Sequence, residues 1–302
     1  MSELRFDGRV AVITGSGRGL GRAYAELLAA RGARVVINDN GSAMTGGGSD
    51  PAPAHEAVEA IRAAGGEAVA NTDSVTTPEG GKAIIETAMD HFGRIDVLIH
   101  NAGNSLVAPL DEITHDEFRL SVDIHLLGGF HVVRPAFPIM KQAGYGRVVL
   151  TGSIGGLYGM PGVVGYSVSK AGLIGLNNLV AIEGADFGVK SNIILPGAHT
   201  RMAADVDTSQ MPPMTPEEVA PAVGWLAHES CSITGELLTS VAGRVARAMF
   251  AETPGVYKPS WTIEDIAANI DAIRNEDGLW TLDQLTGFGE HLMRSFAMAR
   301  AG

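Results

Sequence analysis

A tyrosine, a lysine and a serine occur at spacings that suit proton transfer to or from an alcohol. Tyr166 and Lys170 stand four residues apart in a stretch with helical periodicity, so their side chains lie on one face of a helix. A phenol with a pKa of about 10 is a weak base at neutral pH, but a neighbouring ammonium group stabilises the phenolate and lowers that pKa. Ser153 precedes Tyr166 by 13 residues, at the end of an expected strand, where its hydroxyl can hold the same substrate oxygen. These three residues are the candidate catalytic groups.

A glycine-rich turn near the N-terminus has the composition of a dinucleotide site. Residues 14–21 are TGSGRGLG and stand between the first expected strand and a helix. Glycines at such a turn let the backbone approach a pyrophosphate, and the helix N-terminus receives the negative charge. We therefore predict that a dinucleotide contacts Gly15, Ser16, Arg18, Gly19, Leu20 and Gly21.

An acidic residue at the end of the second expected strand bears on which dinucleotide is bound. Asp39 follows Gly21 by 18 residues, where a carboxylate accepts hydrogen bonds from the adenosine ribose. Arg18 is able to reach a 2′-phosphate and favours NADP instead. Because a phosphate is costly to bury beside a fixed carboxylate, we predict NAD as the cofactor in preference to NADP.

The elements that position these residues alternate between short apolar runs and longer helical windows. The runs are apolar throughout, as strands buried on both faces of a parallel sheet must be. They lie at residues 10–13, 35–37, 68–70, 95–99, 148–150, 192–195 and 237–239. Helical periodicity is found at residues 20–31, 79–92, 115–140 and 163–187. This order predicts an α/β fold, a doubly wound Rossmann-type parallel sheet of about seven strands with helices on both faces.

Two segments depart from that alternation. Residues 40–53 are rich in glycine, serine and proline, and we expect a mobile loop there. Residues after the last expected strand include a helical window at 263–274, with Thr262 as its N-cap. We predict one NAD-binding domain at residues 1–242 and a C-terminal extension at 243–302, which packs on that domain or on a partner subunit.

Composition and charge exclude several classes of protein. Hydrophobic residues make up 45% of the chain, enough for a large core, so global disorder is excluded. The 22 Lys and Arg against 34 Asp and Glu give a net charge of −12 without a basic run, which argues against nucleic acid as a partner. A single cysteine, Cys231, cannot form an intramolecular disulfide, and no histidine spacing suits a metal. We expect a cytoplasmic protein without a metal and without a membrane segment.

Taken together, these motifs resemble those of the short-chain dehydrogenase/reductase family, over about residues 6 to 240. Besides the glycine turn, Ser153, Tyr166 and Lys170, the resemblance rests on Asn101-Ala102-Gly103 and on Pro196-Gly197. It implies that Tyr166 is the general acid/base, that Lys170 lowers its pKa and binds the nicotinamide ribose, and that Ser153 orients the substrate. It also implies cofactor contacts from Asp73, Ser74, Asn101, Ala102, Gly103, Tyr166, Lys170, Pro196, Gly197 and Thr200.

One residue departs from the common pattern of that family. The position that completes a proton relay through water is usually asparagine, and this chain has His125 there. A histidine can donate and accept a proton through its two ring nitrogens, so we predict that His125 takes part in the relay. The alternative is a helix histidine whose hydrogen bonds are satisfied by a neighbour.

Further stretches resemble one subgroup, the (3R)-hydroxyacyl-CoA dehydrogenase units of the peroxisomal multifunctional enzymes (17β-hydroxysteroid dehydrogenase type 4) and their bacterial relatives. The similar stretches are residues 5–9, 21–25, 38–39, 70–75, 145–147 and 228–231. The resemblance implies that a hydride passes from C3 of a (3R)-hydroxyacyl-CoA to NAD, giving the 3-ketoacyl-CoA. The alternatives are a 17β-hydroxysteroid or another bulky alcohol as substrate, and a catalytically idle protein that binds or senses NAD.

The substrate and the family each add one expectation about partners. Coenzyme A carries phosphates that need a cationic patch, for which Arg201, Arg244 and Arg247 are candidates, although solvated surface arginines are the alternative. Members of the family pair through two long helices, which correspond to residues 115–140 and 163–187. The outer faces of these helices keep Leu126, Phe130, Leu173, Leu176 and Leu179. We therefore predict a homodimer or a homotetramer.

Overall fold

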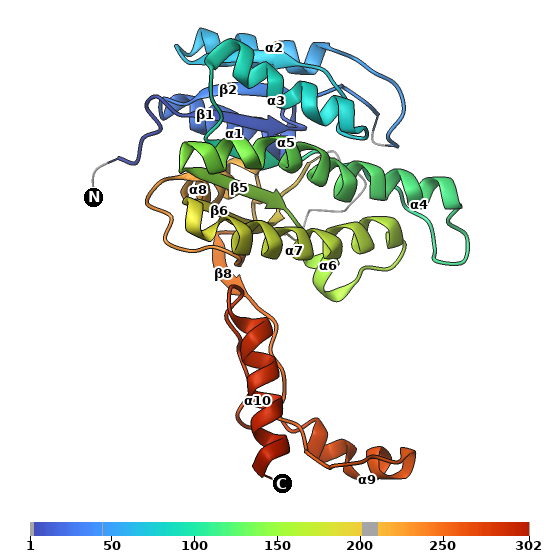
Figure 1. Cartoon of the computed structure of the whole chain (residues 1–302). Helices are drawn as coiled ribbons and strands as arrows, with labels where there is room; N and C mark the ends of the chain where they lie inside the picture. The colour runs from blue at the N-terminus through green and yellow to red at the C-terminus, as the bar shows by residue number, and fades with distance from the viewer. Residues whose placement is uncertain (1–2, 44, 201–210, 302) are drawn as a thin grey trace. The chain divides into compact units, whose positions relative to one another are not determined.

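The computed structural model describes residues 3–43, 45–200 and 211–301 (Figure 1). The chain divides into two compact units, residues 1–247 and residues 248–302. The first unit carries all the candidate site residues named above. Arg201 lies outside the described residues.

A parallel sheet forms the centre of the first unit. Within the described residues the sheet has eight strands in the order β3-β2-β1-β4-β5-β6-β7-β8, and every pair from β3 to β7 is parallel. The connection from β3 to β4 crosses to the other side of β1, so the chain reverses its winding between β1 and β4. Ligands of open α/β sheets bind at the carboxyl ends of the strands beside such a reversal. The strands are β1 (Val10–Thr14), β2 (Arg34–Asn38), β3 (Glu67–Asn71), β4 (Val97–His100), β5 (Gly146–Thr151), β6 (Val189–Gly197), β7 (Leu237–Val241) and β8 (Arg244–Ala248).

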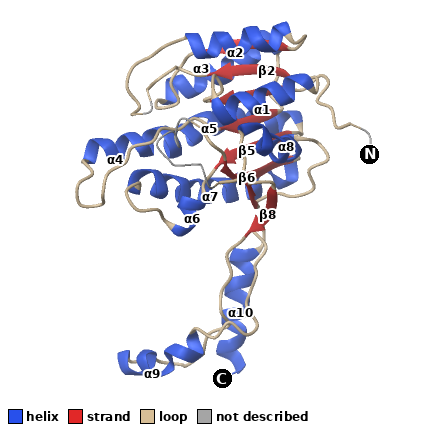
Figure 2. Cartoon of the chain, turned by 180° about the vertical axis from the view of Figure 1, so that it is seen from behind, coloured by secondary structure: helices blue, strands red, loops and turns tan. Residues whose placement is uncertain are grey.

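Helices cover both faces of this sheet. Figures 1 and 2, which view the chain from opposite sides, show α1 and α8 on one face and α5 and α7 on the other. The fold class predicted from the sequence is confirmed. The helices of this unit are α1 (Gly19–Ala30), α2 (Ala52–Ala63), α3 (Pro78–Phe92), α4 (His115–Val122), the π-helix η1 (Asp123–Leu127), α5 (Gly128–Ala143), α6 (Ile154–Tyr158), α7 (Val164–Gly184), the short 3-10 helix η2 (Ala185–Phe187) and α8 (Pro216–Ala227).

The core explains why the strand sequences are apolar without alternation. Every residue of β1 and of β4 is buried, because helices pack on both faces of the sheet. Side chains from β1, β2, α1 and α8 form one continuous cluster, which includes Ile13, Ile37, Tyr24 and Leu226. Burial of such side chains contributes about 25 cal/mol per Å² of apolar surface removed from water.

Two features of the first unit differ from the sequence-based prediction. The window 115–140, expected as one helix, is divided by η1, where the hydrogen-bond spacing widens by one residue. An eighth strand, β8, follows β7 through Ala242 and Gly243, whose φ angles are 49° and 76°. Positive φ at both turn positions gives the tight hairpin that joins antiparallel strands. Its residues, Arg244–Ala248, include two arginines at the edge of the sheet, so they do not form the apolar run from which the other strands were predicted.

The second unit is small and contains α9 (Ile263–Ile273) and α10 (Gly287–Ala301). The Thr262 hydroxyl accepts a hydrogen bond from the backbone N–H of Asp265, so the predicted N-cap is present and forms a capping box. Backbone hydrogen bonds join Glu252 to Trp280, and the guanidinium of Arg294 lies 5.2 Å from the Trp280 ring. Neither helix has a buried residue. Where this extension packs remains a prediction.

Close packing between α3 and α5 gives the first testable expectation. A Cβ at Gly81 would lie 2.4 Å from the carbonyl oxygen of His131. Gly81→Ala should therefore lower the free energy of unfolding by about 1–3 kcal/mol, although alanine favours a helix more than glycine does. Urea unfolding measures this, with Lys82→Ala on the exposed side of the same helix as the control, expected within about 0.5 kcal/mol of the parent. An unchanged Gly81→Ala protein would contradict the packing.

Candidate active site

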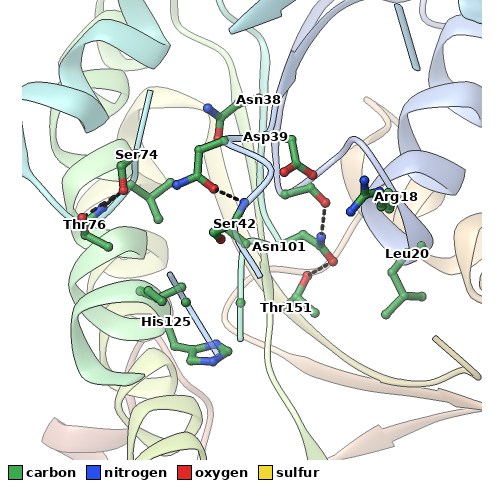
Figure 3. Close-up of a pocket in the computed structure, with 18 of the residues that line it drawn as sticks. Arg18, Leu20, Asn38, Asp39, Ser42, Ser74, Thr76, Asn101, His125 and Thr151 are labelled. Carbon is green, nitrogen blue, oxygen red and sulfur yellow. Dashed lines mark hydrogen bonds between the residues drawn. The ribbon is translucent and has the colours of Figure 1, made fainter. Parts of the chain in front are cut away.

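A cavity of about 530 Å³ lies at the carboxyl ends of the central strands. Figure 3 shows Arg18 and Leu20 on one side of it and Ser74 and Thr76 on the other, with Asn101 between them. The structure thus brings most of the predicted site residues together around one space. The cavity is lined by Gly15, Arg18, Gly19, Leu20, Asp39, Asp73, Ser74, Asn101, Ala102, Gly103, His125, Tyr166, Lys170, Pro196 and Thr200, among others.

The remaining predicted residues contact or adjoin residues that line the cavity. The Ser16 hydroxyl donates a hydrogen bond to the Ile13 carbonyl at 2.7 Å and holds the turn after β1. A Cβ at Gly21 would lie 2.3 Å from the Gly15 carbonyl oxygen, and one at Gly197 would lie 2.7 Å from Val241. Ser153 begins α6, where its Oγ accepts a hydrogen bond from the Gly155 N–H at 3.0 Å.

The glycine turn makes its closest approach to the loop after β4. Gly15 has a φ of 63°, and a Cβ there would lie 2.7 Å from the Cα of Ala102. Asn101 joins the two segments, since its Nδ2 donates to the carbonyl oxygens of Thr14 and Gly15 at 3.3 and 3.0 Å. The first turn of α1 has no acidic residue, and its N-cap, Arg18, makes no side-chain hydrogen bond to it. These features fit a pyrophosphate, because unpaired N–H groups at a helix N-terminus bind anions.

Asp39 lies at the rim of the cavity between the glycine turn and the loop at 40–53. Its Oδ2 accepts a hydrogen bond from the Gly17 N–H at 2.9 Å, and its Oδ1 accepts one from the Gly41 N–H at 2.8 Å. Each carboxylate oxygen has a further lone pair, so Asp39 can also accept from ribose hydroxyls. Arg18 lines the same cavity. The residues therefore fit a nicotinamide dinucleotide.

The loop at 40–53 forms part of the cavity wall. The Asp50 N–H donates to the Asn40 carbonyl at 2.9 Å and closes the neck of the loop. Near its tip, a Cβ at Gly46 would lie 2.9 Å from Cδ2 of Leu120 in α4. Because Ser42, Ala43, Gly46 and Gly48 line the cavity, the loop reaches from the end of β2 across to α4.

Burial dominates the electrostatics of the candidate catalytic groups. Burial raises the pKa of Tyr166, while its hydrogen bond with Ser153 acts in the opposite direction. Burial lowers the pKa of Lys170 to about 7. The Lys170 ammonium group donates to the Thr151 carbonyl at 2.6 Å and lies 5.6 Å from the Tyr166 ring centroid. The expected lowering of the Tyr166 pKa by Lys170 is not found: desolvation of the phenol raises that pKa, and Ser153 is the group that acts against it.

His125 belongs to the π-helix η1 and packs edge-on against Tyr166, with 5.1 Å between the ring centroids. Its Nε2 lies 3.1 Å from the carbonyl oxygen and 3.2 Å from the backbone nitrogen of Asn104. Its Nδ1 is buried and finds no hydrogen-bond partner among the described residues. Burial and the Lys170 charge lower the pKa of His125 well below its usual value, so the ring is neutral. Since Nε2 faces both a donor and an acceptor, either neutral tautomer fits.

Some site residues were not singled out from the sequence. Thr14 and His100 end β1 and β4, and Thr151 ends β5, so all three stand where parallel strands meet the cavity. The side-chain Nδ2 and Oδ1 of Asn104 are buried without a hydrogen-bond partner among the described residues. The only sequence signal for the three strand-end residues was a polar side chain closing an apolar run.

Other candidates are not assembled into the site. Neither Arg244 nor Arg247 is among the described residues that line the cavity, and Arg247 pairs with Glu236 at 3.1 Å. Burial raises the pKa of the Cys231 thiol, consistent with a packing role. Among the described residues no group of three or more His, Cys, Asp or Glu side chains is placed to hold a metal ion.

The fold and the site define the class of protein. The family model for short chain dehydrogenase matches residues 9–211, and the chain belongs to this family. It is therefore an oxidoreductase that acts on CH–OH groups and uses a nicotinamide cofactor, NAD(H) or NADP(H). None of the described helices is long and apolar enough to cross a membrane.

Two curated proteins and one solved structure show which members of the family this chain is similar to. The chain is 42% identical over 294 residues to peroxisomal multifunctional enzyme type 2 of Drosophila melanogaster, covering 94% of this chain and 49% of the relative. It is 41% identical over 269 residues to the peroxisomal hydratase-dehydrogenase-epimerase of Saccharomyces cerevisiae, covering 85% and 29%. A short chain dehydrogenase from Mycobacterium avium superposes with a TM-score of 0.79 at 34% identity, covering 89% of this chain and 95% of that one. The chain thus spans half or less of the length of these two peroxisomal relatives.

The buried lysine leads to a pH dependence of stability. Lys170 has a pKa of about 7 in the folded protein and about 10.4 when unfolded. Between these values the unfolded chain binds more protons, so the free energy of unfolding contributed by this group rises with pH. The stability of the parent relative to Lys170→Met should therefore increase from about pH 7 to about pH 10, measured by urea unfolding without cofactor. Parallel pH profiles for the two proteins would contradict a desolvated lysine.

Proposed function

We propose that the protein is an NAD-dependent dehydrogenase that oxidises (3R)-hydroxyacyl-CoA at C3 to the 3-ketoacyl-CoA. The observation that carries the proposal is the placement of Tyr166, with its Ser153 hydrogen bond, in the same cavity as the glycine turn. The similarity to peroxisomal multifunctional and hydratase-dehydrogenase-epimerase enzymes supports the substrate class.

The chain's own residues account for the proton half of the reaction. Bound NAD supplies the acceptor for the hydride that leaves the substrate carbon. Ser153 and Tyr166 hold the substrate hydroxyl, and the Tyr166 oxygen takes its proton as the carbonyl forms. Because burial favours the neutral phenol, oxidation accelerates as the pH rises, and reduction is favoured at lower pH.

Lys170 and His125 support this proton transfer. Lys170 is anchored on the Thr151 carbonyl and lines the cavity, so its remaining N–H groups can bind the nicotinamide ribose. His125 contacts the Tyr166 ring, and its Nδ1, which has no hydrogen-bond partner in the described part of the chain, can pass a proton through a water molecule. We therefore assign the relay to the ring of His125.

An apolar surface beside Ser153 suits a bulky substrate. The backbone of Ala108 hydrogen-bonds to Gly162 at 2.8 Å, so the segment after β4 runs beside the segment after α6. Val107, Ile154 and Met160 on these segments are 75%, 47% and 54% exposed. Either an acyl chain or a steroid can cover this surface, which keeps a 17β-hydroxysteroid or another bulky alcohol as the alternative substrate.

Two expectations about partners stay proposals. Among the described residues that line the cavity, the Lys and Arg side chains are Arg18 and Lys170, which stand at the cofactor end and at the catalytic end. We therefore expect the CoA phosphates to be bound outside this cavity. A homodimer or homotetramer through α5 and α7 is supported by Phe130 and Leu179, which are 45% and 57% exposed. Leu173, expected on the outer face, is fully buried instead, and a Cβ at Gly129 in α5 would lie 3.0 Å from its Cδ2.

The substrate is tested by assaying NADH formation with a (3R)-hydroxyacyl-CoA and a 17β-hydroxysteroid side by side. We expect a kcat/KM at least about 10-fold higher for the acyl-CoA, and Tyr166→Phe should abolish turnover while NAD still binds. Tyr24→Phe is the matched control, because the buried Tyr24 hydroxyl has no hydrogen-bond partner among the described residues. A preference for the steroid would favour the alternative substrate, and turnover by Tyr166→Phe would contradict the mechanism. No NADH formation with any alcohol would instead favour an idle NAD-binding protein.

The cofactor preference rests on the Asp39 carboxylate. Asp39→Asn keeps one hydrogen-bond acceptor and removes the charge, so the ratio of kcat/KM for NAD to that for NADP should fall by about 10-fold. Asp50→Asn in the same loop is the control, since its carboxylate caps Ala52 and does not line the cavity. A parent enzyme that prefers NADP, or an unchanged ratio in the variant, would refute the assignment.

A further inference from the structure

His100 is a fully buried histidine that no motif singled out and that contacts the backbone of His125, the proposed relay residue. It is the last residue of β4, adjacent to the Asn101-Ala102 loop. Its Nδ1 lies 3.0 Å from the Thr14 hydroxyl oxygen, and its Nε2 lies 3.0 Å from the carbonyl oxygen of His125. One ring therefore connects the end of β1 with the π-helix η1.

The hydrogen bonds around Thr14 determine which ring nitrogen carries the proton. The Thr14 Oγ1 accepts from the backbone N–H groups of Asn101 and Ala102, each at 3.1 Å. A hydroxyl has two acceptor lone pairs and one hydrogen, so both lone pairs are used. The Thr14 hydrogen must then be donated to Nδ1 of His100. The neutral ring consequently carries its hydrogen on Nε2 and donates it to the His125 carbonyl.

Packing and charge keep the ring in this state. A Cβ at Gly129 in α5 would lie 3.2 Å from Cδ2 of His100, so the helix rests closely on the ring edge. The Lys170 ammonium group is the charge that acts on the His100 pKa. Burial, followed by that charge, lowers the pKa of His100 to about 3. The ring is therefore neutral throughout the range in which enzymes usually work.

The contact between His100 and the His125 carbonyl matters because His125 belongs to the π-helix η1. The hydrogen bond from His100 is made to the carbonyl of His125, the residue whose own ring packs on Tyr166. Insertions of this kind in a helix are frequent at functional sites, where they place one side chain out of the regular register. The position of the His125 ring against Tyr166 thus depends on where His100 holds the backbone.

We propose that His100 is a positioning residue, which couples the cofactor-side loop at Asn101-Ala102 to the catalytic π-helix through the chain Thr14, His100 and the His125 carbonyl. The proposal deepens the proposed function and rests on it only in assigning proton transfer to Tyr166 and His125. The tautomer and the hydrogen-bond chain stand independently of the substrate.

The first test needs no activity. In protein labelled with ¹⁵N at its nine histidines, long-range ¹H–¹⁵N spectra report the protonation of each ring nitrogen. The His100 signals, assigned by their loss in His100→Gln, should show a protonated Nε2 and an unprotonated Nδ1 from about pH 5.5 to 8.5. A protonated Nδ1, or a ring that titrates in this range, would overturn the proposal, whatever the substrate.

The second test is a double-mutant cycle, run with whichever alcohol the parent enzyme oxidises. His100→Leu should lower kcat by roughly 10- to 100-fold, with a smaller change in the KM for NAD. His100→Gln keeps one acceptor and one donor and should restore most of kcat, which a purely space-filling role would not produce. In the His125→Ala background, His100→Leu should have no further effect on kcat, because its route of action is already removed. An equal loss in both backgrounds would overturn the coupling, while a parent that oxidises no alcohol would count against the proposed function and leave the tautomer test standing.

Discussion

The close backbone approach between the turn after β1 and the loop after β4 is the contact on which the rest of the site depends. Gly15 leaves no room for a Cβ beside Ala102, and the Asn101 amide ties the two segments together. The approach is possible because β1 and β4 are parallel neighbours at the point where the winding reverses. It places the N-terminus of α1 and the loop after β4 on the same cavity. A larger residue at position 15 would separate the phosphate end of the site from the catalytic end.

Burial is the second constraint, and it acts on every group that moves a proton. Tyr166, Lys170 and His125 all have pKa values shifted toward their neutral forms by desolvation. Neutral side chains have a smaller desolvation penalty on burial than charged ones. Each charge that develops during the reaction then meets fixed hydrogen bonds rather than mobile water. The hydrogen bond between Ser153 and the phenol and the anchor of Lys170 on Thr151 give those groups their orientation.

Much of the fold and of the site was accessible from the sequence, because both are encoded in short stretches. Apolar runs locate the strands from β1 to β7, and the glycine turn, Asp39 and the Tyr166 to Lys170 spacing locate the cavity. What was missed depends on distant partners. The π-helix arises where His100 and Asn104 hold His125 from outside the helix. The inward orientation of Leu173 follows from its contact with Gly129, and β8 is an edge strand whose residues do not form an apolar run. No local pattern reports such contacts.

The central claim is that a hydride passes from C3 of the substrate to the cofactor in a cavity where Tyr166 takes the proton. The most direct measurement uses a (3R)-hydroxyacyl-CoA with deuterium at C3, incubated with the enzyme and NAD, followed by mass spectrometry of the NADH. The account predicts that each NADH formed gains one deuterium and that the acyl-CoA loses it. Unlabelled NADH, or deuterium released to water, would contradict direct hydride transfer.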